Sequence, residues 1–263
     1  MWAFGRFGDN NVDALRWNGR RWSLAHRFSG FVSVTGAAVL SPGDVWMFSD
    51  EGGTWHLTGG HWKRLRLAFS LDIASPVTPA DIWAAGTRML ADGEGVPIVA
   101  RWNGSAWQLR RTPSFPHHDV DPIIGSNFNA IQATSDHDVW VVGGTQIEPA
   151  NGTLSAVPIA IHWTGIGWQS RRPRIAGLLE SFTEDGHGGA WVTAGSFGAS
   201  IPCRLLHFAR GAWACVAVPV VRGKTTSMDS FARVPGTTSV WSAGELFFGN
   251  LPSTDGIILK FGR

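Results

Sequence analysis

The sequence predicts an all-β protein: a β-propeller of six repeat units, each a four-stranded antiparallel blade, with incomplete first and last blades. Two short signatures alternate along the chain, and the first recurs at intervals of 37 to 57 residues. Such a period is typical of propeller blades. The 33 Gly residues suit the many turns that short strands require, and no long segment has the pattern of a helix.

The first signature is an aliphatic residue, a Trp, two small or apolar residues and then a small residue. Val45-Trp46-Met47-Phe48-Ser49 is one copy. In that repeat it forms the second predicted strand, which is entered through the tight turn Ser41-Pro42-Gly43-Asp44. The tryptophans of this signature are Trp2, Trp46, Trp83, Trp140, Trp191 and Trp241.

The second signature is a basic residue, an aromatic residue, Asn-Gly or Thr-Gly, two further residues and a Trp. Arg16-Trp17-Asn18-Gly19-Arg20-Arg21-Trp22 sets the pattern, and further copies begin at Arg101 and His162. Degenerate copies begin at His56 and His207. Asn-Gly or Thr-Gly between apolar runs predicts a hairpin, because Gly readily adopts positive φ.

The second repeat shows all four predicted strands, over Val34–Leu40, Asp44–Phe48, Thr54–Leu57 and Trp62–Leu67. The first repeat lacks its first strand and the last repeat lacks its fourth. We therefore expect either an unusual closure or a chain that is a piece of a longer protein. The prediction is one propeller domain over 1–263, with repeats at approximately 1–29, 30–69, 70–113, 127–173, 178–219 and 225–263.

The combined pattern Asp-Val-Trp-x-x-Gly and Arg/His-Trp-Asn-Gly-x-x-Trp resembles the repeats of secreted or surface-anchored bacterial propeller proteins. These are grouped loosely with Asp-box and kelch-like propellers, and the resemblance covers nearly the whole chain. It implies a secreted or cell-envelope location, although Met1 leads directly into a strand and no signal peptide is recognised. Asp50–Trp55 looks like one Asp-box core, Asp-x-Gly-x-Thr-Trp. It departs from the Asp-box pattern because Ser49 is one position too close to the Asp and because the segment lies before the third strand, not after it. We therefore interpret it as a turn.

Composition excludes several classes of protein. With 44% hydrophobic and 16% charged residues the chain is globular, and its net charge of +2 is too small to favour nucleic acid or an anionic membrane. The chain contains no run of eighteen apolar residues, so no membrane-spanning helix is predicted.

The two cysteines are not expected to form a disulfide. Extending the hairpin register places Cys215 opposite Leu206, and Cys203 opposite Val218 on the other face of the sheet. We therefore expect two small buried residues.

Fourteen of the fifteen tryptophans fall at three repeated positions, which favours packing between blades over carbohydrate stacking. Trp55 is the exception and is the aromatic candidate for a ligand contact.

A basic residue precedes the aromatic residue of the second signature, or Leu57 in the degenerate copy of the second repeat. The set is Arg16, His56, Arg101, His162, His207 and Lys260. In a closed propeller these residues would form a ring, which could bind an acidic glycan or phosphate. A repeated position favours a structural role instead, with Asp44, Asp81 and Asp138 as hydrogen-bond partners.

No catalytic residue, metal ligand or cofactor is assigned. The chain has no Tyr, which excludes a sialidase nucleophile and a copper site of the galactose-oxidase type. It also lacks a Gly-x-Ser-x-Gly elbow, a phosphate loop and a Cys-x-x-Cys motif. The segment His117-His118-Asp119-Val120-Asp121 has residue types that bind metals, but a polar loop without a metal has the same composition.

Turns between the first and second strands, and between the third and fourth, are short and share one face. The other connections share the opposite face and are long, as at Arg111–Asn127, Val220–Ser227 and Phe247–Asp255. Loops on a rigid scaffold often carry function, so we expect the long-loop face to bind the ligand. The candidate site residues are Trp55, Arg88, His117, His118, Asp119 and Asp121.

The leading interpretation is a non-catalytic propeller that binds a glycan or a protein outside the cell, as a monomer or as part of a longer chain. One alternative is a carbohydrate-active enzyme, a glycosidase or lyase, that uses loop carboxylates. The other alternative is a structural repeat segment of a larger surface protein.

Overall fold

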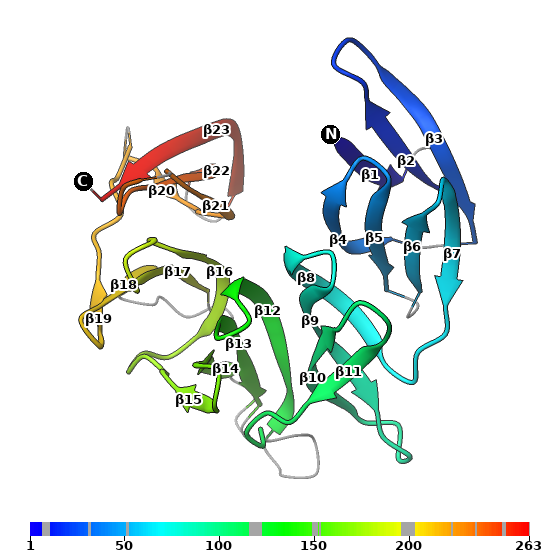
Figure 1. Ribbon diagram of the computed structural model, residues 1–263. Coiled ribbons are helices and arrows are strands. Elements are labelled where there is room, and N and C mark those ends of the chain that lie inside the picture. Colours follow the sequence, from blue (N-terminus) through cyan, green and yellow to red (C-terminus); the bar gives the residue numbers. More distant parts are fainter. Residues whose placement is uncertain are drawn as a thin grey trace. The chain divides into compact units, whose positions relative to one another are not determined.

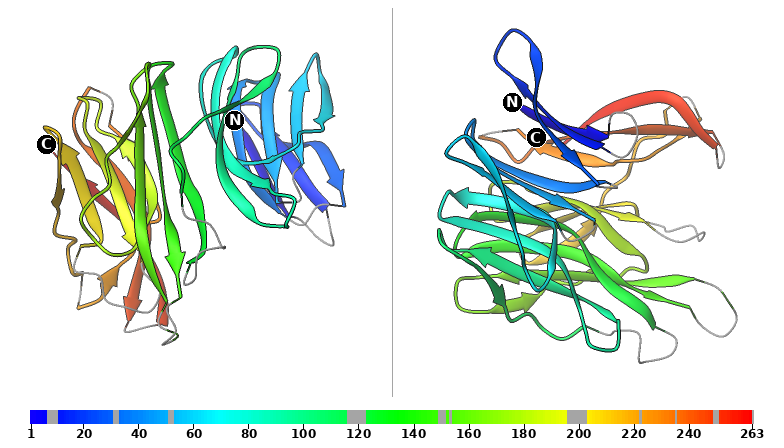
Figure 2. Two further views of the ribbon diagram at one scale, coloured as in Figure 1. Left: turned by 90° about the horizontal axis from the view of Figure 1, so that it is seen from below. Right: turned by 90° about the vertical axis from the view of Figure 1, so that its right-hand side faces the viewer.

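The computed structural model describes residues 1–6, 11–30, 33–50, 53–115, 123–148, 152, 154–195, 203–221, 223–234, 236–248 and 251–262. These residues form six antiparallel sheets and contain no helix that could span a membrane. The chain divides into two compact units, one over 1–114 and 133–139 and the other over 115–132 and 140–263. Within each unit the sheets stand side by side (Figures 1 and 2).

The first three sheets follow one another along the chain. The first sheet is β1 (Trp2–Arg6), β2 (Asn11–Trp17) and β3 (Trp22–Ser29). The second is β4 (Val34–Ser41), β5 (Asp44–Ser49), β6 (Thr54–Thr58) and β7 (His61–Leu65). The third is β8 (Ser70–Thr78), β9 (Asp81–Met89), β10 (Gly95–Trp102) and β11 (Trp107–Arg110).

The fourth and fifth sheets repeat this order. The fourth is β12 (Ile123–Ser135), β13 (Asp138–Ile147), β14 (Ser155–Trp163) and β15 (Trp168–Ser170). The fifth is β16 (Leu178–Glu184), β17 (Ala190–Gly195), β18 (Leu205–Ala209) and β19 (Ala212–Cys215).

In the sixth sheet the first strand is divided into β20 (Thr225–Thr226) and β21 (Ser230–Arg233). Both parts pair with β22 (Val240–Phe248), and β23 (Leu251–Phe261) pairs with the other side of β22.

The two signatures form the strands and hairpins that the sequence predicts. The aromatic pair of the second signature lies directly across its hairpin, as in Trp17↔Trp22 and Trp102↔Trp107. Gly19 and Gly104 in these turns have φ of 97° and 91°, a conformation that favours Gly. Close packing of the backbone explains why the last residue of the first signature is small. At Gly86, a Cβ atom would lie 2.1 Å from the Ser70 carbonyl oxygen.

Two of the expected long loops are shorter in the structure. β22 continues to Phe248 and β23 begins at Leu251, and these two residues pair with each other, so most of Phe247–Asp255 is strand. β12 begins at Ile123, within the expected loop Arg111–Asn127. Both segments contain apolar residues that extend a strand, and the polar residues around them concealed this pattern.

The sheets pack face to face through one repeated arrangement. Within each unit, the Trp of the first signature lies on one face of its sheet and meets the hairpin aromatics of the following sheet. Trp46 lies 4.8 Å from Trp102 and 5.3 Å from Trp107, measured between ring centroids. In the other unit, Trp140 lies 5.2 Å from Phe208. The core of each unit is therefore a series of apolar layers between consecutive sheets.

Cys203 and Cys215 form a disulfide, so the prediction of two unlinked thiols is wrong. Cys215 does lie opposite Leu206, as expected. However, β18 begins only at Leu205, so the ladder that would carry Cys203 away from Cys215 stops before reaching it. The two Cα atoms are 5.6 Å apart, a usual separation for a disulfide.

We expect the double variant Cys203→Ser/Cys215→Ser to lower the free energy of unfolding by about 2–4 kcal/mol, because the bond closes a short loop in the unfolded chain. Urea denaturation followed by Trp fluorescence measures this loss. Mass spectrometry of the alkylated, non-reduced protein is the control, and two alkylated cysteines would contradict the disulfide.

Candidate functional site

The repeated basic residues lie directly across from the repeated tryptophans. The cross-strand pairs are Trp2↔Arg16, Trp46↔His56, Trp83↔Arg101, Trp191↔His207 and Trp241↔Lys260. The imidazole rings of His56, His162 and His207 stack on the neighbouring indoles at centroid distances of 3.9, 4.3 and 4.2 Å. The guanidinium of Arg101 lies 5.2 Å from the ring centroid of Trp83. Each of these basic groups therefore covers an indole within its own sheet.

Carboxylates hold several of these basic groups in place. Arg101 donates two hydrogen bonds to Asp81, of 2.6 and 2.9 Å, and His56 Nε2 lies 2.8 Å from Asp44 Oδ1. These are two of the partners that the sequence suggests. The third suggested partner, Asp138, accepts a hydrogen bond from Thr134 Oγ1.

The fifth sheet uses a carboxylate that the sequence analysis missed. Gly189 stands where three other repeats have Asp, and Asp185 from the preceding turn lies 3.0 Å from His207 Nε2 instead. The backbone N–H groups of His187 and Gly189 donate to the same carboxylate at 2.8 and 2.9 Å. Burial opposes its ionisation, but these two N–H groups and His207 together hold the pKa of Asp185 below its usual range. The signal in the sequence was the turn Asp185-Gly186-His187-Gly188.

The predicted ligand residues do not come together in the described part of the chain. Trp55 lies among apolar residues of the first two sheets, with its ring 5.0 Å from Phe28 and the Arg64 guanidinium 5.8 Å from its centroid. Arg88 is exposed near the end of β9, in the third sheet. The remaining candidates, His117, His118, Asp119 and Asp121, lie outside the described residues.

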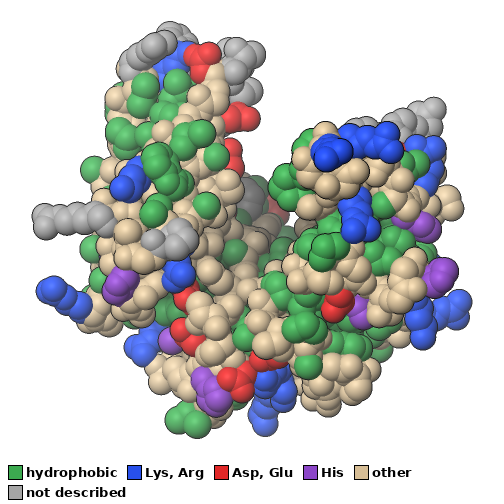
Figure 3. All heavy atoms as spheres, turned by 45° about the horizontal axis from the view of Figure 1, so that its top comes forward, with side chains coloured by type: hydrophobic (Ala, Val, Ile, Leu, Met, Phe, Trp, Pro, Cys, Tyr) green, Lys and Arg blue, Asp and Glu red, His purple; other side chains and the backbone are tan. Residues whose placement is uncertain are grey.

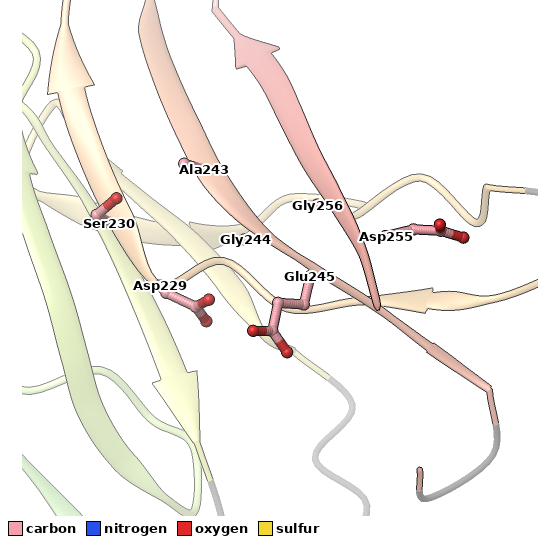
Figure 4. Close-up of a pocket in the computed structure, with 7 residues that line it drawn as sticks. All are labelled: Asp229, Ser230, Ala243, Gly244, Glu245, Asp255 and Gly256. Carbon is pink, nitrogen blue, oxygen red and sulfur yellow. The ribbon is translucent and has the colours of Figure 1, made fainter. Parts of the chain in front are cut away.

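A pocket in the sixth sheet brings three carboxylates together. It has a volume of about 470 Å³ and is lined by Asp229, Ser230, Ala243, Gly244, Glu245, Asp255 and Gly256. Strand pairing creates it, because the Asp229 N–H donates to the Ala243 carbonyl and Glu245 pairs with Gly256. Figure 4 shows the Asp229 and Glu245 side chains directed toward one another and Asp255 directed away. Lys224 Nζ lies 2.9 Å from the Asp255 carboxylate.

A fourth carboxylate, Glu180, approaches this pocket from the fifth sheet. The neighbouring Ser181 donates its hydroxyl to the Asp229 carbonyl, which ties the two sheets together here. Desolvation by the surrounding sheet, and then the negative charge of Asp229, raise the pKa of Glu180, while Arg204 partly offsets the rise. Gly195 leaves room for this carboxylate, because a Cβ there would lie 1.9 Å from Glu180 Oε1.

Glu180 and Asp229 share a position that is polar in five repeats. The position lies in the first strand of each of those repeats, one residue after the residue that packs against the small last residue of the first signature. There the side chain carries an oxygen atom. The residues are Thr35, Asp72, Asn129, Glu180 and Asp229. In β8 and β16 the residue falls at a β-bulge, and desolvation and then Asp50 raise the pKa of Asp72 as well. An alignment of the first strands would have found this position, whereas the tryptophan signatures do not include it.

No protein-family model and no curated protein matches the chain. Among solved structures, the GH74 xyloglucanase of Xanthomonas campestris is similar over 92% of this chain, with a TM-score of 0.58 and 13% identity. YCF48 from Cyanidioschyzon merolae is similar over 84% (TM-score 0.47, 11% identity), and YCF48 bound to D1 peptide over 81% (0.47, 13%).

This chain spans 42% of the length of the xyloglucanase, and 67% and 60% of the two YCF48 chains. The xyloglucanase is a β-propeller protein, so its likeness supports a propeller-type repeat architecture and carries no activity with it.

The pKa of Asp185 is lower in the folded protein than in the unfolded chain, so its ionised carboxylate stabilises the fold fully above the unfolded-state pKa of about 4. We expect the free energy of unfolding to fall as the pH drops below that value, because protonation of Asp185 removes this stabilisation. Asp185→Asn should flatten that part of the pH profile and cost about 1–3 kcal/mol at neutral pH, since it weakens a satisfied buried carboxylate. Urea denaturation at a series of pH values measures both effects. Asp92→Asn, in the exposed β9–β10 turn, is the control, and an equal loss there would contradict the assignment.

Proposed function

We propose that the chain is a non-catalytic binding module of the secreted or cell-envelope type, built as one six-bladed β-propeller. It binds a positively charged segment of a protein partner in the pocket formed by Asp229, Glu245 and Asp255. The observation that carries the proposal is the open carboxylate pocket at the long-connection end of the sixth sheet. The Cys203–Cys215 disulfide supports an oxidising compartment.

The uncovered face of the sixth sheet supports a closed propeller. In the second to fifth sheets the repeated Trp is at most 4% exposed, whereas Trp241 in the sixth is 47% exposed. Ile258, two residues before Lys260 in β23, is 70% exposed, while the equivalent Leu205 of the fifth sheet is fully buried. Figure 3 shows hydrophobic side chains gathered on this sheet, at the upper left. A further sheet packed there, as a closed ring would supply, gives this face the cover that the others have.

We expect Ile258→Arg to lower the free energy of unfolding by about 2 kcal/mol or more, because a closed propeller would bury a charge there. Ile166→Arg is the matched control, since Ile166 is 94% exposed in a hairpin turn and should tolerate the change within about 0.5 kcal/mol. Chemical denaturation measures both variants. Equal, small losses would mean that the face is open and the ring is not closed.

The pocket has the charge and position for a cationic ligand. In the described part of the chain neither Asp229 nor Glu245 forms an ion pair, while Asp255 is held by Lys224. Asp229 follows the connection 220–227, and Glu245 and Asp255 flank the β22–β23 turn, so all three lie at the end predicted to bind. Two carboxylates directed toward one another attract an amine or guanidinium, and the volume suits one long side chain.

We expect the purified protein to bind Lys- and Arg-containing peptides on an array, and to ignore copies in which Gln replaces the basic residues. Asp229→Asn/Glu245→Gln should weaken binding at least tenfold, and raising the salt from 50 to 300 mM should weaken it further. Fluorescence anisotropy with an array-derived peptide measures the affinities. Asp92→Asn, which removes an exposed carboxylate elsewhere, should bind as the wild type does.

Two results would overturn this assignment. Unchanged affinity in the double variant would place the ligand elsewhere, and reproducible hits on neutral glycans would change the ligand class.

One observation favours a second candidate, a glycosidase: the raised pKa of Glu180 beside Asp229 is typical of paired carboxylates in such enzymes. Release of reducing sugar from a polysaccharide panel that is lost in Glu180→Gln would establish that candidate and refute a non-catalytic role.

A further inference from the structure

A lysine of the chain itself already places an amine on the carboxylate pocket. Lys224 Nζ donates a hydrogen bond of 2.9 Å to the carboxylate of Asp255, which is one of the residues that line the pocket. The lysine side chain is 21% exposed, whereas the aspartate side chain is 53% exposed. The ammonium group is therefore held against the protein, and the carboxylate that it neutralises stays in contact with solvent.

The backbone around Lys224 fixes the point from which its side chain extends. The Lys224 N–H donates to the Val221 carbonyl at 2.9 Å, and the Val221 N–H donates to the Lys224 carbonyl at 3.2 Å. Gly223, in the turn between them, has φ of 72°, a conformation that favours Gly. Thr225, the next residue, begins β20, which pairs with β22. A tight turn on one side and a paired strand on the other thus keep Lys224 within reach of Asp255.

Lys224 and Asp255 approach one another from opposite sides of β22. β20 pairs with one side of β22, and β23 pairs with the other side. Lys224 directly precedes β20, and Asp255 lies in β23 next to Gly256, which pairs with Glu245. The lysine side chain therefore spans β22 close to the position from which Glu245 enters the pocket.

This ion pair divides the pocket carboxylates into two kinds. Figure 4 shows Asp229 and Glu245 directed toward one another and Asp255 directed away from them. Because Lys224 neutralises Asp255, the pair adds little net charge to the pocket. The negative charge that a ligand meets therefore comes from Asp229 and Glu245, and a facing pair of carboxylates suits one basic group.

The other carboxylate beside the pocket also has a basic neighbour. Glu180 approaches from the fifth sheet, and the positive charge of Arg204 partly offsets the rise in the pKa of Glu180. Carboxylates at the margin of the pocket thus have counter-charges from the chain. Among the described residues, Asp229 and Glu245 form no ion pair.

We propose that Lys224 is a specificity-determining residue of the carboxylate pocket. By neutralising Asp255 it restricts the site to one basic residue of the ligand, so that a second, adjacent basic residue brings no advantage. Lys224 does not contact the ligand and remains on Asp255 when the ligand is bound. The inference rests on the cationic ligand proposed above and states which cationic segments the pocket selects.

The first test compares two labelled peptides, one with a single Arg flanked by Gly and Ser and one with two adjacent Arg in the same surroundings. We expect the wild-type protein to bind both peptides with affinities within about twofold of one another. Lys224→Gln should bind the second peptide at least about fivefold more tightly than the first, because the released Asp255 attracts the second Arg. Fluorescence anisotropy measures the affinities. Lys224→Arg keeps the charge and is the matched control, which should behave as the wild type does.

A cycle of variants separates a counter-charge from a ligand contact. Asp255→Asn removes the charge that neutralises Lys224, so the lysine should repel the single-Arg peptide and weaken its binding about threefold. Adding Lys224→Gln to Asp255→Asn should return the affinity to within about twofold of the wild-type value, because the two changes cancel in charge. A double variant as weak as Asp255→Asn alone would show that Asp255 itself binds the ligand, and the proposal would be wrong.

The ion pair is also tested without a ligand. The chain has three lysines, Lys63, Lys224 and Lys260, so mass spectrometry resolves their acylation by an amine-reactive reagent. Lys224 should react at least about threefold more slowly than the exposed Lys63 and Lys260, and Asp255→Asn should remove most of this difference. The single-Arg peptide should leave the rate at Lys224 unchanged. Faster acylation with the peptide bound would mean that the ligand displaces Lys224, contrary to the proposal.

Failure of this inference and failure of the pocket itself give different results. If the wild type binds neither peptide, or if Asp229→Asn/Glu245→Gln leaves the affinity unchanged, the pocket assignment fails and the role of Lys224 fails with it. If that double variant weakens binding but Lys224→Gln shows no preference for two Arg, the pocket stands and the role of Lys224 is refuted.

Discussion

The repeated indole between consecutive sheets is the contact on which the rest of the structure depends. A cross-strand His or Arg covers the ring within its own sheet, as His56 covers Trp46, and hairpin aromatics of the next sheet enclose it from the other side. Burying one indole in this way contributes about 4–6 kcal/mol of hydrophobic free energy. Since each repeat supplies both the Trp and the hairpin pair, the same chemistry stacks consecutive sheets within each unit.

This regularity explains which features the sequence could predict. Trp spacing and the Asn-Gly or Thr-Gly turns are local patterns, so the hairpins and their register, such as Trp102↔Trp107, follow from them directly. The disulfide was mispredicted because the hairpin register was extended past Leu205, where β18 begins. Asp185 was missed because it reaches His207 from a turn, and not from the position that Asp44 and Asp81 occupy in their repeats.

The carboxylate pocket could not be predicted from spacing for a related reason. Asp229, Glu245 and Asp255 lie in three different segments of the last repeat and share no motif. They meet because β22 is paired on both sides, with the first strand of the sheet on one side and β23 on the other. The long-loop argument pointed toward this end of the strands but selected His117, His118, Asp119 and Asp121, which lie outside the described residues. Only the strand pairing shows which charges converge at that end of the sheet.

The sixth sheet combines the departures from the repeat that matter for binding. Its first strand is divided into β20 and β21, and Asp229, Glu245 and Asp255 line one pocket. A repeat that packs identical faces has no need of such features for stability, because the other sheets are stable without them. Natural sequences depart from local regularity mainly where function requires it. The concentration of these departures in one sheet is therefore the reason for proposing a binding site there, and not at the tryptophans that make the sequence recognisable.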